Sequence, residues 1–135
     1  MNLEMFIQQL SRMLGQIEAQ AFQQEGFSDL TMRQLLYLET IAQMDGPTFS
    51  QLAEELNVTL PSVSVLVKKL IDLGYVKKLQ SEQDGRAYHL KLTPTGNRMA
   101  QLHNQIHRWL AKKITSNLNE RDLHNLAELL GKIEF

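Results

Sequence analysis

Hydrophobic residues at both ends of the chain recur at steps of three and four, the spacing of one face of an α-helix. The pattern runs from Leu3 to Ala21 and returns from Leu123 to Ile133. A single narrow apolar stripe is typical of a helix that packs against another helix along one seam. We therefore expect a helix with such a seam at each end of the chain.

Three shorter helices are predicted in the first half of the chain, each opened by a threonine whose hydroxyl can accept a hydrogen bond from a first-turn amide. They cover residues 31–44, 48–56 and 59–73. In the second, Gln51 follows Thr48 by three positions, which is a capping-box pattern. Only Asn57 and Val58 separate the second helix from the third, so the connection must be tight.

The period of the pattern changes after Gly74. Residues 75–80 and 87–92 are rich in β-forming side chains and flank a polar loop, which predicts a two-stranded hairpin. A hairpin of two strands is marginal alone, so it must pack against the helices.

The remaining sequence predicts a long helix opened by Thr93 and Pro94, ending near Ser116, and a last helix capped by Asn119. The expected fold is mainly α, with about six helices and one hairpin. A short capped helix, a tight turn and a second capped helix followed by a hairpin form a winged helix-turn-helix.

Length and composition favour one folded domain. The chain has 135 residues, of which 43% are hydrophobic and 21% charged. It has no cysteine, which excludes disulfides and thiolate zinc sites and favours the reducing cytoplasm. No uncharged apolar run approaches the roughly 20 residues of a membrane span, and the start lacks the basic flank of a signal peptide. We expect a cytoplasmic protein without a membrane segment.

The formal net charge is −1, but the charges are unevenly distributed. Residues 59–92 contain six basic and three acidic side chains, a local balance of +3, whereas the rest of the chain sums to −4. A basic segment of this kind favours nucleic acid as a partner. On charge alone, a solvated lysine-rich surface stays an alternative.

The second helix of a helix-turn-helix enters the DNA major groove, and its N-terminal end reaches the base edges. Here that helix carries Ser62 and Ser64, which are small donors and acceptors suited to base edges. Lys68 and Lys69 lie farther along and supply charge for phosphates.

The hairpin loop offers one arginine. The planar guanidinium of Arg86 suits the narrow, electronegative minor groove. Asp84, two residues earlier, either orients Arg86 or shapes the turn.

Short motifs between Leu30 and Met99 belong to one recognisable set. They are Leu30-Thr31 with Gln34, Leu52-Ala53-Glu54-Glu55-Leu56, Val63-Ser64, Lys69-Leu70, Leu73-Gly74-Tyr75-Val76, Asp84-Gly85-Arg86 and Leu92-Thr93-Pro94-Thr95-Gly96. Together they resemble the MarR-type transcriptional regulators. The resemblance implies a homodimer that binds a palindromic operator on double-stranded DNA and usually represses transcription.

The resemblance also implies how the chain is divided and which residues bind DNA. It implies a single domain over residues 1–135, with a winged helix part at 31–95 and dimerisation helices at 1–25 and 96–135. Its DNA contacts fall on Ser62, Ser64, Lys68, Lys69, Asp84 and Arg86. One position departs from the family: Val65 cannot hydrogen-bond a base edge, although it can touch a thymine methyl group.

Many members of the family release DNA when a small aromatic or lipophilic acid enters a cleft between the dimerisation helices and the winged helix part. The residues that could line such a cleft here are Met32, Arg33, Tyr37 and Trp109. Each of these side chains is also an ordinary core or surface residue, and the sequence does not identify an effector.

A different signal is suggested by His103 and His107, which are four residues apart and can face one ion, with Glu18 approaching from the first helix. These positions resemble those used by zinc-responsive members of the family. However, the position of a further histidine in those members is Leu36 here. The alternative is that both histidines are exposed polar residues, and no cofactor is implied.

Two other classes of function are alternatives to DNA binding. The chain has no nucleophile elbow, zinc-protease, phosphate-loop or dinucleotide motif, so we expect no enzyme. A winged helix can also hold protein partners without binding DNA, because fold alone does not determine function. The basic hairpin with Arg86 favours DNA.

Overall fold

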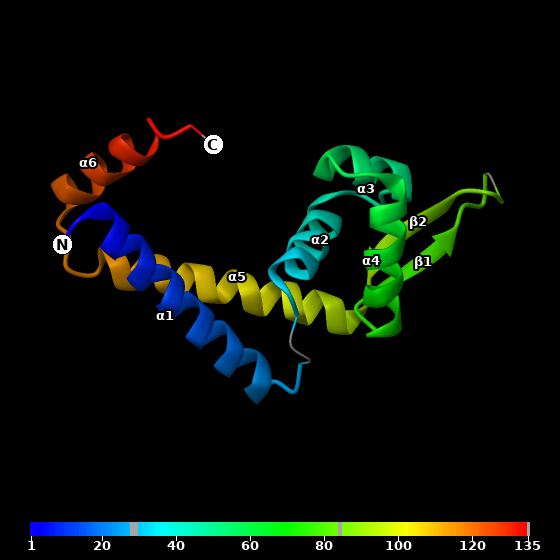
Figure 1. Cartoon of the computed structure of the whole chain (residues 1–135), viewed down its shortest axis with the longest axis horizontal. Helices are drawn as coiled ribbons and strands as arrows, with labels where there is room; N and C mark the ends of the chain where they lie inside the picture. Colours follow the sequence, from blue (N-terminus) through cyan, green and yellow to red (C-terminus); the bar gives the residue numbers. More distant parts are fainter. Residues whose placement is uncertain (28–29, 84, 135) are drawn as a thin grey trace.

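The computed structural model describes residues 1–27, 30–83 and 85–134. These residues form six helices and two strands, which confirms the predicted fold class. In chain order the elements are α1 (Leu3–Gln24), α2 (Met32–Gln43), α3 (Phe49–Leu56), α4 (Leu60–Asp72), β1 (Val76–Gln80), β2 (Tyr88–Leu92), α5 (Pro94–Thr115) and α6 (Glu120–Leu130) (Figure 1).

The helices begin at the capping residues that the sequence predicts. The hydroxyls of Thr31 and Thr48 each accept a hydrogen bond at 3.1 Å from the backbone amide three residues later. In both cases the side-chain oxygen of that later residue, a glutamine, accepts at 2.9 Å from the threonine amide. Asn119 accepts from the Asp122 amide at 2.8 Å in the same way. Local hydrogen bonds therefore set where these helices start.

The helix-turn-helix formed by α3 and α4 depends on a single residue with left-handed backbone. Asn57 ends α3 with φ 53° and ψ 47°, a conformation that asparagine tolerates better than most side chains. Thr59 then caps α4 two residues later. Because the connection is tight, the chain turns sharply and α4 crosses α3 (Figure 1). The buried side of α4 then packs in the core.

The hairpin pairs β1 and β2 antiparallel, from Val76 opposite Leu92 to Gln80 opposite Tyr88. It is tied to the connection between α2 and α3. The Leu90 amide donates to the Pro47 carbonyl at 2.8 Å, and Nδ1 of His89 lies 2.7 Å from the Gly46 carbonyl. These contacts anchor the base of the wing, as the marginal stability of a lone hairpin requires.

The main core lies where α2, α3, α4, the hairpin and the start of α5 meet, and we call these elements the winged unit. Each of these elements contributes fully buried side chains. Among them are Leu38, Leu52, Val63, Val67, Leu70, Val76, Leu90 and Met99.

Close packing joins the winged unit to α5. A Cβ atom on Gly96 would lie 2.0 Å from the Tyr75 carbonyl oxygen, so no other residue fits there without movement. The same carbonyl accepts from the Thr93 amide at 3.0 Å. The first turn of α5 is thereby fixed against the start of β1.

From this junction α5 extends away from the hairpin to the far end of the molecule, where α6 lies, and α1 packs against it (Figure 1). We call α1, the distal part of α5 and α6 the end helices. They bury little: α6 has no buried residue, and α1 has only Glu18 and Phe22. Among the described residues, no helix is both long and apolar enough to cross a membrane.

Candidate DNA-binding surface

Helix α4 is buried along one side and open along the other. Val63, Val67 and Leu70 are buried, and each of the four predicted DNA contacts on this helix is exposed. These contacts are Ser62, Ser64, Lys68 and Lys69. Val65 forms the crest between them, with 73% of its surface exposed.

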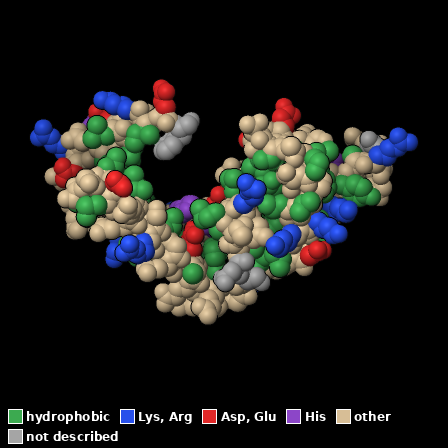
Figure 2. Space-filling model, viewed as in Figure 1, with side chains coloured by type: hydrophobic (Ala, Val, Ile, Leu, Met, Phe, Trp, Pro, Cys, Tyr) green, Lys and Arg blue, Asp and Glu red, His purple; other side chains and the backbone are tan. Residues whose placement is uncertain are grey.

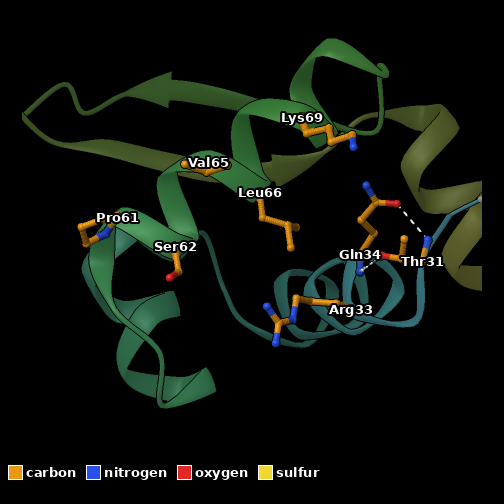
Figure 3. A pocket seen from close by; sticks show the side chains of 8 residues that line it. All are labelled: Thr31, Arg33, Gln34, Pro61, Ser62, Val65, Leu66 and Lys69. Atoms are coloured by element: carbon orange, nitrogen blue, oxygen red, sulfur yellow. Dashed lines mark hydrogen bonds between the residues drawn. The ribbon is translucent and has the colours of Figure 1, made fainter.

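A groove of about 530 Å³ separates α4 from the start of α2 (Figure 3). Ser62 and Lys69 face it from α4, and Arg33 faces it from α2. Leu66 points into the groove between the two helices. The Ser62 hydroxyl lies 2.8 Å from the Thr59 hydroxyl, so part of its hydrogen-bonding capacity serves the helix cap.

A second groove, of about 550 Å³, lies between α4 and β1. Ser64 and Lys68 face it from α4, and Lys78 faces it from the strand, with Asp72 as the acidic residue in its lining. The Lys78 ammonium lies 5.0 Å from the centre of the Tyr88 ring, a cation–π contact. The four predicted residues of α4 are thus divided between two grooves, a distribution that spacing along the helix did not reveal.

The loop of the hairpin carries Arg86, which is exposed and lies beyond the paired strands. The side-chain amide of Gln80 donates to the Gly85 carbonyl, which closes the loop next to the arginine. Asp84, predicted to orient Arg86 or to shape the turn, lies outside the described residues. Lys and Arg side chains lie over the winged unit and near the hairpin tip in the space-filling view (Figure 2).

A third hollow, a cleft of about 380 Å³, lies between the end helices and α2. Figure 2 shows this concave side with histidine and acidic side chains on its floor. The lining consists of Leu14, Glu18, Met32, Arg33, Leu35, Leu36, Glu39, His103 and His107. Arg33 therefore borders both this cleft and the groove beside α4.

Two of the four residues considered for an effector cleft line it, and two do not. Met32 and Arg33 are part of the lining. Tyr37 is only 3% exposed and belongs to the core. Trp109 lies farther along α5, where the Lys113 ammonium is 5.3 Å from its ring.

A buried histidine lies at the floor of this cleft. Nδ1 of His103 is 3.0 Å from Oε1 of Glu18 on α1, and its Nε2 is 2.6 Å from Oε1 of Glu39 on α2. The interpretation of His103 as an exposed polar residue is wrong, because α1 and α2 cover it. It does hold for His107, whose exposed ring lies 4.2 Å from that of His103.

The approach of Glu18, which the sequence suggested, is confirmed. The role of Glu39 was missed, because helical spacing along α5 carries no information about α2. Within the described part of the chain, Oε1 of Glu18 and Nδ1 of His103 lie close together without hydrogen-bond alignment, and both are buried.

The architecture, with an exposed polar helix beside a basic hairpin, is that of a winged helix-turn-helix protein. Residues 28–87 match the sequence model of the MarR family. The match covers less than half of the chain, and together with the relatives and solved structures it supports a MarR-family winged-helix transcriptional regulator.

Two named relatives illustrate the match. The uncharacterised HTH-type transcriptional regulator YhjH of Bacillus subtilis is 26% identical over 89 residues, or 66% of this chain and 51% of that protein. The multiple antibiotic resistance protein MarR of Salmonella typhimurium is 29% identical over 106 residues, or 78% of this chain and 74% of that protein. The chain thus spans about half the length of the Bacillus relative and about three quarters of the other.

Solved structures show the same architecture. FabT of Streptococcus pneumoniae, crystallised in complex with DNA, has a TM-score of 0.72 at 26% identity, covering 96% of this chain and 93% of that one. MepR of S. aureus bound to ethidium bromide has a TM-score of 0.77 at 24% identity, covering 98% and 94%, and is similar in fold. Several curated relatives are named as HTH-type transcriptional regulators or repressors, in agreement with the prediction of a regulator rather than an enzyme.

Proposed function

We propose that this chain is a homodimeric repressor that binds a palindromic operator in the cytoplasm. The observation that carries the proposal is the exposed side of α4, where serines and lysines lie beside a basic hairpin. Two similar proteins support this role: FabT was crystallised in complex with DNA, and a mycobacterial relative is named an HTH-type transcriptional repressor.

In this proposal the exposed residues of α4 have distinct tasks. Ser64 donates to or accepts from a base edge, and Val65, at the crest of the helix, contacts a thymine methyl group. Lys68 and Lys69 neutralise phosphates without regard to sequence. The Ser62 hydroxyl also contacts the Thr59 hydroxyl in the cap of α4. Its contact with a base is therefore weaker than that of Ser64.

Arg86 inserts into the minor groove beside the site of α4. Its exposure beyond the last strand pair allows this, and the negative potential of a narrow minor groove favours a guanidinium. Asp84 keeps its proposed role beside Arg86.

The end helices supply the dimer. Residues 1–25 and 96–135 contain the apolar seams, and their outer leucines are not covered within one chain: Leu3 is 71% exposed and Leu130 56%. A twofold axis between two such regions places two α4 helices about 34 Å apart, one turn of the duplex.

The direct test is selection of bound fragments from a random duplex library, followed by mobility shifts at two salt concentrations. We expect a palindromic sequence to be enriched and affinity to fall steeply with salt, because counterions are released for each phosphate neutralised. Arg86→Ala should weaken binding with the dimer intact, whereas Arg121→Ala on α6 should not. Equal binding by both variants would refute the role of the wing, and no duplex binding at low salt would favour a protein-holding winged helix.

The cleft beside α2 is the proposed site of a small aromatic or lipophilic effector. Leucines and Met32 form its apolar side, and Arg33 supplies a cation at its rim. An effector acts only if it binds the DNA-incompetent shape better, with about 1 to 3 kcal/mol of coupling being typical. A thermal-shift screen of aromatic and lipophilic acids should find a compound that wild type binds and that Leu36→Trp, which narrows the cleft, does not. A compound that stabilises both equally binds elsewhere.

A divalent metal ion such as zinc is a second candidate signal for the same cleft. Ligand atoms of Glu18, His103 and His107 lie within 4.8 Å of one another, and two of them are buried without a hydrogen bond among the described residues. Glu39, on the other nitrogen of His103, would orient the imidazole toward the ion. Together these residues offer the nitrogen and oxygen donors that zinc accepts.

Calorimetric titration with zinc chloride tests this candidate. Wild type should bind with saturation, His107→Ala should not, and His124→Ala on α6 serves as the matched control. No saturable binding by wild type would remove the metal and leave the organic effector.

A further inference from the structure

We infer that Arg33 and Lys78 contact the DNA backbone. Neither residue belongs to the recognition helix α4, and the two lie on opposite sides of it. The inference rests on the proposed DNA binding and extends the interface from α4 and the hairpin loop to α2 and β1. It is carried by the two grooves that flank α4.

On the first side, Arg33 is the second residue of α2 and faces Ser62 and Lys69 across the groove (Figure 3). Its side chain extends along the groove from α2. Arg33 and Lys69 are both cations, and the lining of this groove has no acidic residue among the described positions. The neighbouring Thr31 and Gln34 are engaged with each other in the capping box.

The Arg33 guanidinium is exposed, and no ion pair or hydrogen bond is found for it within residues 1–27, 30–83 and 85–134. An arginine offers five N–H donors in a fork that matches a phosphate. No carboxylate among the described residues pairs with the Arg33 guanidinium, so this group is available for an external anion.

On the second side, Lys78 projects from β1 toward α4 and shares a groove with Ser64 and Lys68. The strand pairing explains its direction: Lys78 lies opposite Leu90, on the face that packs toward the core, whereas Lys77 lies on the other face. The Tyr88 ring holds its ammonium at 5.0 Å. Asp72 in the same lining lowers the net positive charge of this groove to one.

The arrangement matches the surroundings of a helix in the major groove. There the helix is bounded by two phosphate strands across a groove about 12 Å wide. With α4 as the central ridge, the strand of phosphates on one side meets Arg33 and Lys69, and the strand on the other side meets Lys68 and Lys78. Such contacts position the protein and do not read sequence.

The experiment compares matched glutamine variants of the full chain. Arg33→Gln is paired with Arg121→Gln, because both arginines are the second residue of an exposed helix start and Arg121 lies outside the apolar seam. Lys78→Gln is paired with Lys77→Gln, its neighbour on the opposite face of β1. Binding to a random-sequence 30-base-pair duplex, and to the operator selected as above, is followed by fluorescence anisotropy over a salt series.

Each test variant removes one phosphate contact per protomer, so the slope of log affinity against log salt should fall by about two for a dimer. At about 0.1 M salt the affinity should fall roughly tenfold or more, by the same factor on both duplexes. Arg33→Lys should keep most of the slope. Sedimentation and thermal melting should show that every variant remains a folded dimer.

This inference would be overturned if Arg33→Gln and Lys78→Gln had the same salt slopes as their controls, Arg121→Gln and Lys77→Gln. If wild type binds DNA in that case, the proposed function still holds. A loss confined to the selected operator would also overturn it, because it would indicate a base contact. If wild type binds neither duplex at any salt concentration, the proposed function and this inference fail together.

Discussion

Leucines are used in two different ways in this molecule. In the winged unit, Leu38, Leu52 and Leu70 are at most 1% exposed and are enclosed by several elements. In the end helices, Leu3, Leu129 and Leu130 are all more than half exposed. The residues are equally hydrophobic, so the difference comes from what surrounds them.

The winged unit completes its own core, whereas the end helices leave an apolar surface that one chain does not cover. Contiguous apolar surface of this kind marks an interface in a folded protein. The winged unit therefore presents the proposed DNA-binding surface, whereas the packing of the end helices is proposed to require a second copy.

The largest effect should come from the core of the winged unit. Leu52→Ala, at a position with no exposed surface, should lower the free energy of unfolding by about 2–5 kcal/mol. Urea denaturation measures it, and the loss should not depend on protein concentration. A loss below about 1 kcal/mol would mean that this core is looser than its burial indicates.

In the end helices a change at a leucine should act on association instead. Leu130→Glu places a charge in the seam of α6 and should raise the dimer dissociation constant roughly a thousandfold, because burial of a leucine contributes about 2 kcal/mol and each dimer loses two. Sedimentation equilibrium gives the constant. A monomeric wild type, or a variant that dimerises equally well, would contradict the assignment of the end helices.

The junction of the two regions is sensitive at Gly96. Alanine normally improves a helix by up to about 1 kcal/mol relative to glycine, but here its Cβ would meet the Tyr75 carbonyl at 2.0 Å. Gly96→Ala should therefore destabilise the protein by about 1–3 kcal/mol in thermal melting. Gly15→Ala on α1, where a Cβ meets nothing within 4 Å, is the control and should not destabilise it.

The smallest effect concerns sequence readout on α4. Ser64→Ala should cost about 1 kcal/mol on the selected operator and little on random duplex, since one hydrogen bond to a base is lost. Lys68→Ala should weaken both duplexes equally. Anisotropy titrations on the two duplexes measure these losses. If Lys68→Ala weakened only the operator and Ser64→Ala weakened both duplexes, the assignment of base contact to Ser64 and phosphate contact to Lys68 would be wrong.

Much of the fold could be predicted because its signals are local. Thr31, Thr48, Thr59 and Asn119 cap the helices that their sequence positions predict, and Gly74 follows α4 with the positive φ of a helix end. Each of these features depends on hydrogen bonds within a few residues. The DNA-contacting roles of α4 and of Arg86 stay predictions, although their exposure permits them.

The contacts that the sequence did not predict are formed between side chains of different helices. Glu39 reaches His103 from a helix more than sixty positions earlier, and Arg33 faces Lys69 across a groove that no spacing rule describes. The same packing buries His103, whereas helical periodicity alone predicts either an exposed polar residue or a metal ligand at this position.

The order and ends of the helices, the hairpin and the polar side of α4 were determined by the sequence itself, because they follow from short-range hydrogen bonding and from the periodicity of apolar residues. Only the tertiary structure decided which charges share a groove, that His103 lies between two carboxylates, and which leucines stay open to solvent. The physical reason is that these properties depend on the distance between side chains from separate elements, and that distance is set by packing of the whole core.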